Sequence, residues 1–264
     1  MKVDADLVST RIVDLGARGR VARLTIERAA KLNALDGPTV RALIAAAHPL
    51  SGDPELRAVV VTGAGARAFV GGADVDTMAA LDPASAEAFI TELHRAIAAI
   101  RAIPVPVIAR VNGYCLGAGL ELAAACDLRI ASDNAVFGMP EVKVGMPSVI
   151  EAALLPRLVG WGATARLVLL GENIDSAEAL RIGLLEKVVA IGELDAAVDA
   201  WVDAILGAGA EAVRLQKALM REWERLPLDA AIDAGIKTFR ASFSGAEPSR
   251  MLKSFLERRR VPRA

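Results

Sequence analysis

A continuous apolar stretch near the middle of the chain constrains the fold most. Residues 111–126 read VNGYCLGAGLELAAAC, and Glu121 is the one side chain among them expected to carry charge at neutral pH. Burying a lone carboxylate costs several kcal/mol unless another group binds it. The fold must therefore give Glu121 a partner or a polar cavity. A partly wet glutamate in the first turn of a helix, stabilised by the helix dipole, is the simpler alternative.

A second acid, Glu141, follows this stretch at a separation of 141 − 121 = 20 residues. It comes directly after Pro140, and proline favours an irregular turn over a helix or a central strand. A helix, a short strand at residues 128–131 and a turn fit between the two acids, so the chain can place both carboxyl groups around one cavity. Such a pair can take a proton from water and deliver a proton nearby. The spacing therefore favours a catalytic site.

Small residues precede Glu121 at the expected start of its helix, in Gly117-Ala118-Gly119. Backbone N–H groups in a first helical turn have no partner within the helix and can bind an anion. The glycine-rich turn at residues 69–74, after a strand at 58–62, offers a second candidate donor, although for this turn taken alone we favour an ordinary glycine loop. Residues 63–67, GAGAR, superficially resemble a dinucleotide fingerprint, but FVGG at 69–72 interrupts the helix that this fingerprint requires. We therefore expect no nicotinamide-binding domain.

Three motifs, AFVGGAD, VNGYCLGAGLELAAACD and FGMPEVKVG, occur in this order after KLNAL at residues 31–35. Together they resemble the signature of the crotonase (enoyl-CoA hydratase/isomerase) superfamily over most of the chain. The resemblance implies an α/β fold, a spiral of repeated ββα units over residues 1–192 that holds the CoA-ester site. A helical trimerisation region, residues 193–264, would follow. The implied substrate is an acyl-CoA thioester, with no separate cofactor or metal, and the implied assembly is a homotrimer or homohexamer.

The resemblance also implies roles for single residues. The backbone amides of Ala73 and Ala118 would form an oxyanion hole for the thioester oxygen. Glu121 and Glu141 would hold the water, with Glu141 supplying the proton at the α-carbon. The positions that match CoA contacts are Arg28, Lys31, Ala34, Gly71, Ala73, Asp74, Val75, Phe255 and Arg258.

Some of these positions have alternative explanations. Arg28 and Lys31 can equally form a solvated surface pair. Asp76 stands where the family often has lysine, which puts a CoA contact from that position in doubt. In the family, the positions matching Phe255 and Arg258 often enclose the CoA of a neighbouring subunit.

The leading functional hypothesis is an enoyl-CoA hydratase, which adds water across the 2,3 double bond of a 2-enoyl-CoA. A double-bond isomerase, in which one glutamate shuttles a proton between carbons, is the second hypothesis. A non-catalytic acyl-CoA-binding paralogue is the third, and the retention of both glutamates speaks against it. The sequence does not define the acyl chain.

Glu151 has two interpretations. Ser148 and Glu151 have the spacing of a capping box ahead of an apolar helix, and we favour this structural role. Some crotonase relatives recruit a catalytic acid from this segment, which would make Glu151 a third acid. His94 and His48 are expected at surface or boundary positions, since neither has a nucleophile or a metal partner at a suggestive spacing.

Composition excludes several classes of protein. The net charge of −1 over 264 residues gives no basic footprint, so we expect no nucleic-acid partner. Cys115 and Cys126 form neither a disulfide framework nor a zinc motif. The N-terminal residues resemble no signal peptide, and no charge-free run exceeds the 11 residues of 42–52, so we expect no membrane partner and a cytoplasmic location.

Periodicity predicts the remaining elements. A helix is expected after Ser148, broken at Pro156, and Trp201, Leu206, Trp223 and Phe239 are expected to pack partly against other subunits. Strands are expected at residues 10–15, 20–27, 57–62, 105–111 and 187–190. Helices are expected from residue 36 and over 83–103, 193–206, 210–225, 228–239 and 247–259.

Overall fold

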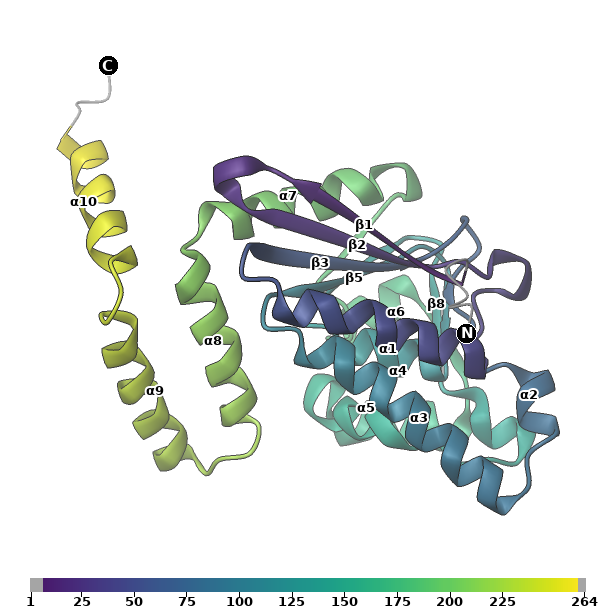
Figure 1. Ribbon diagram of the computed structural model, residues 1–264. Coiled ribbons are helices and arrows are strands. Elements are labelled where there is room, and N and C mark those ends of the chain that lie inside the picture. Colours follow the sequence, from purple (N-terminus) through teal and green to yellow (C-terminus); the bar gives the residue numbers. More distant parts are fainter. Residues whose placement is uncertain (1–6, 261–264) are drawn as a thin grey trace.

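The structure is a computed structural model, and it describes residues 7–260. Apolar strands form two sheets (Figure 1). The larger sheet has the order β1-β2-β3-β5-β7-β10, and its strands are β1 (Val8–Asp14), β2 (Arg20–Ile26), β3 (Leu56–Gly63), β5 (Val107–Val111), β7 (Leu128–Ser132) and β10 (Lys187–Val189). The smaller sheet has the order β4-β6-β8-β9, with β4 (Ala68–Val70), β6 (Tyr114–Leu116), β8 (Val136–Gly138) and β9 (Asn173–Asp175).

The two sheets are connected by a repeating path. Each of the consecutive strand pairs β3/β4, β5/β6 and β7/β8 places one strand in each sheet before the chain enters helical structure. Within each sheet these strands run parallel to one another, as strands contributed by successive turns of a spiral must. The predicted spiral of ββα units is therefore confirmed. The two strands predicted at residues 10–15 and 20–27 are present as β1 and β2, and they form an antiparallel hairpin with Val8 opposite Ile26.

The larger sheet is buried on both faces. Val59 and Val61 of β3 join the main core, whereas Val60 between them points to a second cluster with Ile108 and Ile130. This alternation follows from the two-residue period of a strand. Two-sided burial also explains why the sequence of β3 is a continuous apolar run.

Helices cover both faces of this sheet. On the main-core side, Asp36 accepts a hydrogen bond from the Thr39 N–H and so caps α1 (Gly37–Gly52). The other helices of the spiral are α2 (Val75–Ala79), α3 (Pro83–Ala102), α4 (Ala118–Ala125), α5 (Leu155–Leu170) and α6 (Ser176–Arg181). Short 3₁₀ helices are η1 (Gly16–Arg18), η2 (Ala29–Lys31), η3 (Pro140–Val144), η4 (Ile150–Leu154) and η5 (Ile191–Glu193).

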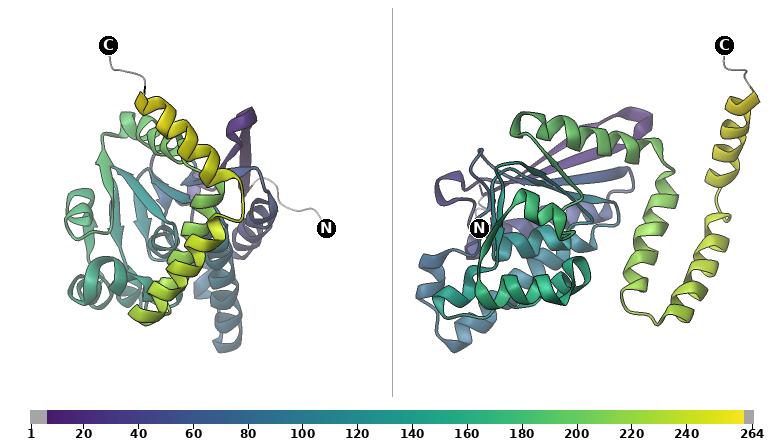
Figure 2. Two further views of the ribbon diagram at one scale, coloured as in Figure 1. Left: turned by 90° about the vertical axis from the view of Figure 1, so that its left-hand side faces the viewer. Right: turned by 180° about the vertical axis from the view of Figure 1, so that it is seen from behind.

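After η5 the described chain is entirely helical, as predicted. Its helices are α7 (Leu194–Gly207), α8 (Ala210–Trp223), α9 (Leu228–Ser242) and α10 (Glu247–Arg260). Helix α7 packs on the second face of the larger sheet, α8 lies beside the spiral, and α9 and α10 extend away from it (Figure 2). The proposed division of the chain at residue 192 stays a prediction, and α7 is in contact with the spiral.

Two expectations about this part of the chain need correction. Helix α5 is not broken at Pro156, because proline in a first helical turn lacks only an N–H that would be unpaired anyway; the helix bends instead at Gly160, where φ is +77°. Leu206, expected partly at a subunit contact, is buried within the same chain, in the cluster under α7, and Trp201 packs in part against that cluster. Their periodicity identified a buried face without identifying what it packs against.

A buried basic residue holds α8 to the spiral. Lys217 is 7% exposed, and its Nζ donates hydrogen bonds to Asp127 Oδ2 at 2.6 Å and to the Val105 carbonyl at 2.8 Å. Arg221 reaches the other oxygen of Asp127 at 3.1 Å. Burial lowers the pKa of Lys217, and Asp127 opposes that shift. The charged form of Lys217 is therefore stabilised by its two hydrogen-bond acceptors, Asp127 and the Val105 carbonyl.

We expect Lys217→Ala to lower the free energy of unfolding by about 2–4 kcal/mol, because it removes one cation from a buried carboxylate and leaves Arg221 alone with it. Urea denaturation measures the change. Lys237→Ala, at an exposed site on α9, is the matched control and should change stability by less than about 0.5 kcal/mol. Equal effects of the two substitutions would contradict the role of Lys217.

Candidate active site

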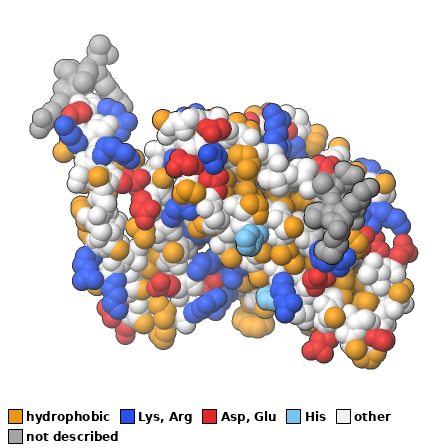
Figure 3. Space-filling model, in the orientation of Figure 1, with side chains coloured by type: hydrophobic (Ala, Val, Ile, Leu, Met, Phe, Trp, Pro, Cys, Tyr) orange, Lys and Arg blue, Asp and Glu red, His pale blue; other side chains and the backbone are white. Residues whose placement is uncertain are grey.

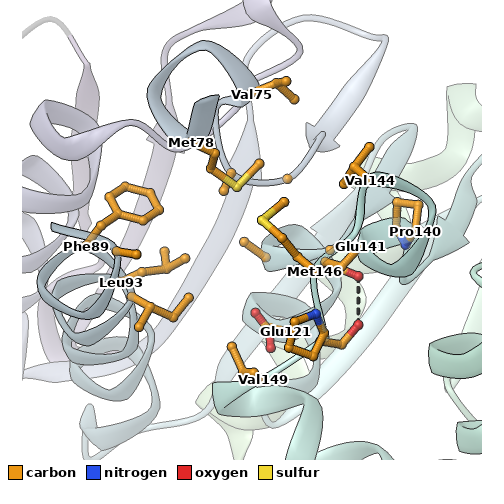
Figure 4. A pocket seen from close by; sticks show the side chains of 18 of the residues that line it. Val75, Met78, Phe89, Leu93, Glu121, Pro140, Glu141, Val144, Met146 and Val149 are labelled. Carbon is orange, nitrogen blue, oxygen red and sulfur yellow. Dashed lines mark hydrogen bonds between the residues drawn. The ribbon is translucent and has the colours of Figure 1, made fainter. Parts of the chain in front are cut away.

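A cavity of about 500 Å³ lies between α2, α3, α4 and the η3 segment (Figure 4). Its walls are mainly apolar, with Met78 from α2, Phe89 and Leu93 from α3, and Met146 and Val149 from the segment after η3. The four residues predicted for catalysis all line it, namely Ala73, Ala118, Glu121 and Glu141. The structure thus brings together groups that are up to 68 residues apart (141 − 73).

The smaller sheet explains why these groups meet. Ala73, Ala118 and Glu141 come shortly after β4, β6 and β8, which are parallel neighbours. The carboxyl ends of parallel strands lie at one edge of a sheet, where open α/β proteins place ligands. Three successive turns of the spiral therefore each contribute one group to the cavity.

Glycines around α4 permit its close approach to the other turns. A Cβ on Gly119 would overlap the carbonyl oxygen of Val70 in β4. A Cβ on Gly117 would overlap Glu141 Oε1, and Gly117 also has a φ of +51°, which other residues rarely adopt. The small residues that the sequence places here are thus required by backbone contacts between turns.

Two residues that line the cavity, Ala73 and Ala118, have backbone N–H groups without a protein acceptor in the described part of the chain. Leu35 forms a parallel bridge with Ala73, in which its N–H bonds the Gly72 carbonyl and its own carbonyl accepts from Asp74, each at 2.9 Å. Ala118 is the first residue of α4, where an N–H has no acceptor within the helix. Within residues 7–260, neither amide donates to a protein acceptor. The oxyanion hole expected from these two amides stays a prediction.

Glu121 is the most perturbed carboxyl group in the cavity. All eight residues of α4 are buried, and Glu121 itself is 4% exposed. Its Oε1 accepts a hydrogen bond from the Ala152 N–H at 2.9 Å. Burial raises its pKa to about 8, the Ala152 N–H opposes this shift, and the charges of Glu141 and Glu151 add to it. The alternative of a partly wet first-turn glutamate is therefore wrong, although Glu121 does lie in the first turn.

Glu141 is oriented by a neighbour that the sequence did not single out for this role. The Ser148 hydroxyl donates to Glu141 Oε2 at 2.8 Å, which Figure 4 marks as a dashed line. The opposite oxygen, Oε1, lies against Gly117. Glu141 is thus held between the loop after η3 and the start of α4, facing the same cavity as Glu121.

The predicted capping box of Ser148 and Glu151 is wrong. The segment forms the 3₁₀ helix η4, whose N-cap residue is Val149, and no side chain caps it. Ser148 uses its hydroxyl on Glu141, and the side chain of Glu151 turns away to His94, with Oε1 2.7 Å from Nδ1. The spacing of a capping box assumes an α-helix, which begins only at Leu155. Glu151 does not line the cavity either.

The positions matched to CoA contacts fall into four groups. Gly71, Ala73 and Val75 line the cavity. Arg28 binds Asp36 at 3.0 Å, Asp74 at 3.2 Å and the Ala34 carbonyl, so these residues form one internal cluster beside the cavity loop. Lys31 forms an exposed ion pair with Asp76 at 2.9 Å.

The remaining two positions, Phe255 and Arg258, lie on α10. That helix is on the opposite side of the molecule from α2 and α3, which line the cavity (Figures 1 and 2). The side chain of Glu247 at its start accepts from the Ala212 N–H of α8 at 2.9 Å. Within one chain, therefore, α10 is not brought to the cavity, and all the CoA contacts stay predictions.

Comparison with known proteins agrees with this geometry. The sequence profile described as "Enoyl-CoA hydratase/isomerase" matches residues 16–262. The chain belongs to this family. A short-chain-enoyl-CoA hydratase of Clostridium acetobutylicum is 36% identical over 94% of this chain and 96% of its own. A crotonyl-CoA hydratase of Syntrophomonas wolfei is 38% identical over 92% and 94%.

Solved structures of the family share the fold. An enoyl-CoA hydratase of Mycobacterium smegmatis superimposes with a TM-score of 0.91 at 31% identity, over 97% of this chain and 98% of that one. DspI of Pseudomonas aeruginosa superimposes with a TM-score of 0.89, also at 31% identity, over 98% and 96%. The crotonase fold predicted from the motifs is confirmed.

We expect Glu121→Gln to stabilise this hydratase/isomerase family member at alkaline pH. The folded-state pKa of about 8 exceeds the ordinary 4.5, so the native state binds the proton more tightly than the unfolded chain. Wild-type stability should therefore fall as pH rises from about 4.5 to 8, whereas glutamine stays neutral. The advantage of the variant should grow over this window to roughly 4–5 kcal/mol, since the pKa of Glu121 rises by about 8 − 4.5 = 3.5 and one pKa unit corresponds to about 1.4 kcal/mol.

Urea denaturation at several pH values between 5 and 9 measures this difference. Glu55→Gln, at an exposed site, is the control and should show no comparable growth with pH. A pH-independent difference for Glu121→Gln would contradict the raised pKa.

Proposed function

We propose that the protein is an enoyl-CoA hydratase, which adds water across the 2,3 double bond of a 2-enoyl-CoA thioester. One observation carries the proposal: two carboxyl groups and two backbone N–H groups without protein acceptors line a single apolar cavity. The relatives named short-chain-enoyl-CoA hydratase and crotonyl-CoA hydratase support the reaction. The apolar walls from α2 and α3 suit an acyl chain.

In the proposed reaction, the thioester oxygen accepts hydrogen bonds from the N–H groups of Ala73 and Ala118. Negative charge that develops on this oxygen then meets donors that are already in place. Water gives a proton to one carboxylate as its oxygen bonds the β-carbon, and the other carboxyl group gives a proton to the α-carbon. The product gains one water, and the total number of protons on the two carboxyl groups is unchanged. A proton then passes from the group that deprotonated the water to the group that protonated the α-carbon, which restores the starting state. No cofactor beyond the CoA of the substrate takes part.

Glu121 and Glu141 share these proton transfers. The resemblance to the family assigns delivery of the α-proton to Glu141, with Glu121 helping to deprotonate the water. Burial, however, raises the pKa of Glu121 and so favours a proton on it. Because the two carboxyl groups interact, the protonation state belongs to the pair, which supplies the acid and the base that hydration requires.

A double-bond isomerase on the same scaffold is the alternative. It needs only one carboxyl group to shuttle a proton between carbons. The hydroxyl of Ser148 and the N–H of Ala152 hold two separate carboxyl groups at the cavity, and this favours hydration. A binding protein without turnover would need neither of these two carboxyl groups.

We further propose a homotrimer, alone or paired into a hexamer. Helix α9 presents an exposed apolar stripe at helical spacing, made of Leu228, Ile232, Ile236, Phe239 and Phe243. Apolar side chains are visible among charged ones along this part of the molecule in Figure 3. Trp223 of α8 is also exposed. A neighbouring subunit that covers this stripe would also allow Phe255 and Arg258 to reach the cavity of another chain.

We also propose a cytoplasmic location. Cys115 and Cys126 are buried free thiols, which agrees with a reducing compartment. Among the described residues, one helical stretch, Ile150–Leu170, has the length and composition of a membrane span. It contains the buried Glu151 and the bend at Gly160, and we interpret it as a pair of helices at the surface of the spiral.

We expect Glu141→Gln to lower the rate of crotonyl-CoA hydration by about a hundred- to ten-thousandfold with little change in KM, because it removes proton transfer and leaves the N–H groups in place. Loss of the enoyl absorbance measures the rate. Glu193→Gln, on η5, is the control and should keep full activity. Near-normal turnover of a folded Glu141→Gln protein would refute the assignment, and isomerisation without hydration would favour the alternative.

We expect Ile236→Glu to dissociate the proposed trimer, because a charge at the centre of the α9 stripe cannot be buried without a partner. Light scattering after gel filtration measures the mass. Lys237→Glu, beside the stripe, should leave the assembly intact. A wild-type protein that is monomeric at micromolar concentration would contradict the trimer.

A further inference from the structure

The segment that binds Glu121 has an unusual backbone. Ile150 has a φ of +40°, a strained conformation that β-branched residues rarely adopt. Two residues later, the Ala152 N–H donates both to the Val149 carbonyl at 3.0 Å and to Glu121 Oε1 at 2.9 Å. The turn at residues 149–152 therefore aims one N–H at a buried carboxyl group. Some interaction must hold the turn in this shape.

Glu151, in the middle of the turn, supplies that interaction. Its side chain is 8% exposed, and Oε1 lies 2.7 Å from Nδ1 of His94 on α3. Within residues 7–260 this is the one side-chain hydrogen bond between α3 and η4. His94 is 51% exposed, so the pair links a surface residue to the turn behind the cavity.

Glu151 is not placed to act on the substrate. It does not line the cavity, and its second oxygen, Oε2, is buried and has no hydrogen-bond partner in the described part of the chain. A carboxyl group buried at such cost without contact to the cavity needs another explanation. The contact with His94 and the strained neighbour Ile150 point to a mechanical role.

We propose that His94 and Glu151 are positioning residues for Glu121: their hydrogen bond holds the strained turn at residues 149–152 so that the Ala152 N–H fixes Glu121 Oε1 at the cavity. The inference rests on the proposed function only in that Glu121 is taken as a catalytic carboxyl group. It adds a contact from α3 that controls the geometry of that group from outside the cavity.

The charges around the turn make it possible to distinguish positioning of Glu121 from general structural support, because the two kinds of change shift the pKa of Glu121 in opposite directions. Glu121 faces Glu141 of η3 and Glu151 of η4, and both raise its pKa, while the Ala152 N–H lowers it. Glu151 faces His94 and Arg101, both on α3. Loss of the Ala152 bond should therefore raise the pKa of Glu121, whereas loss of the Glu151 charge with the turn kept in place should lower it.

Two substitutions test these opposite shifts in the pKa of Glu121. His94→Ala releases the turn and leaves the Glu151 charge, so the pKa of Glu121 should rise. Glu151→Gln keeps a hydrogen-bonding side chain of the same size and removes the charge, so the pKa of Glu121 should fall. His94→Asn places an amide N–H near the position of Nδ1 and should restore most of the wild-type behaviour. Glu92→Gln, which weakens an ion pair of α3 with Arg41, is the matched control.

Carbon-13 NMR of protein with labelled glutamate, with the Glu121 signal assigned by its loss in Glu121→Gln, measures the titration without any substrate. Hydration of crotonyl-CoA over pH 6–10 gives kcat and KM of the same proteins. We expect His94→Ala to lower kcat about tenfold or more, with KM within about twofold, since a small displacement of a catalytic group affects turnover more than binding. Glu92→Gln should leave kcat and the titration unchanged.

An unmoved Glu121 titration in His94→Ala would overturn the inference, as would a shift in the same direction in His94→Ala and Glu151→Gln. Equal loss of kcat in His94→Ala and His94→Asn would also overturn it, since the restored hydrogen bond would then have no effect. If wild-type protein fails to hydrate crotonyl-CoA while the opposed titration shifts are present, the positioning role stands and the proposed substrate falls.

Discussion

The carboxyl group of Glu121 lies on a helix whose eight residues are all buried, and the cost of keeping it there determines how the segments around it are arranged. An uncompensated carboxylate in such surroundings would be protonated permanently or would prevent folding. Here one backbone N–H, from Ala152, compensates it only in part, so its pKa stays near 8. The protein thus retains a group that exchanges a proton near neutral pH. The Ala152 N–H is the donor, and the strained residue Ile150 belongs to the same turn. Glu151 of that turn contacts His94.

Close backbone contacts are the second requirement of the site. Gly119 lies against Val70 of the preceding turn of the spiral, and Gly117 lies against Glu141 of the following one. A side chain at either glycine would push the turns apart. The same proximity keeps the first N–H of α4 at the cavity. The glycines therefore serve both packing and chemistry, and the two roles cannot be separated at these positions.

Much of the fold was predictable because the signals are local. The start of a helix at residue 36, the two opening strands and the apolar run of β3 each depend on neighbours in sequence. The meeting of Glu121 and Glu141 was also predictable, since only a helix, a strand and a turn separate them.

Contacts between distant segments were not predictable. The partner of Glu151 is 57 residues away, and Arg28 binds Asp74 across 46 residues. Local spacing suggested a capping box for Glu151, but Ser148 has a better acceptor in Glu141, and the strained turn replaces the expected α-helical start. In the same way, the periodicity of α7 identified its apolar face but not the sheet beneath it.

The spiral path has a consequence for how such a protein can diversify. The groups that follow β4, β6 and β8 are spaced by hydrogen-bonded neighbouring strands, a distance that the backbone itself sets at about 4.8 Å per strand. The walls formed by α2 and α3 belong to the connection between two turns and carry no such restraint. Insertions or deletions in that connection can reshape the space for an acyl chain while the reacting groups keep their separation. The architecture thus combines groups whose spacing is fixed by the sheet with cavity walls that can change in length and shape.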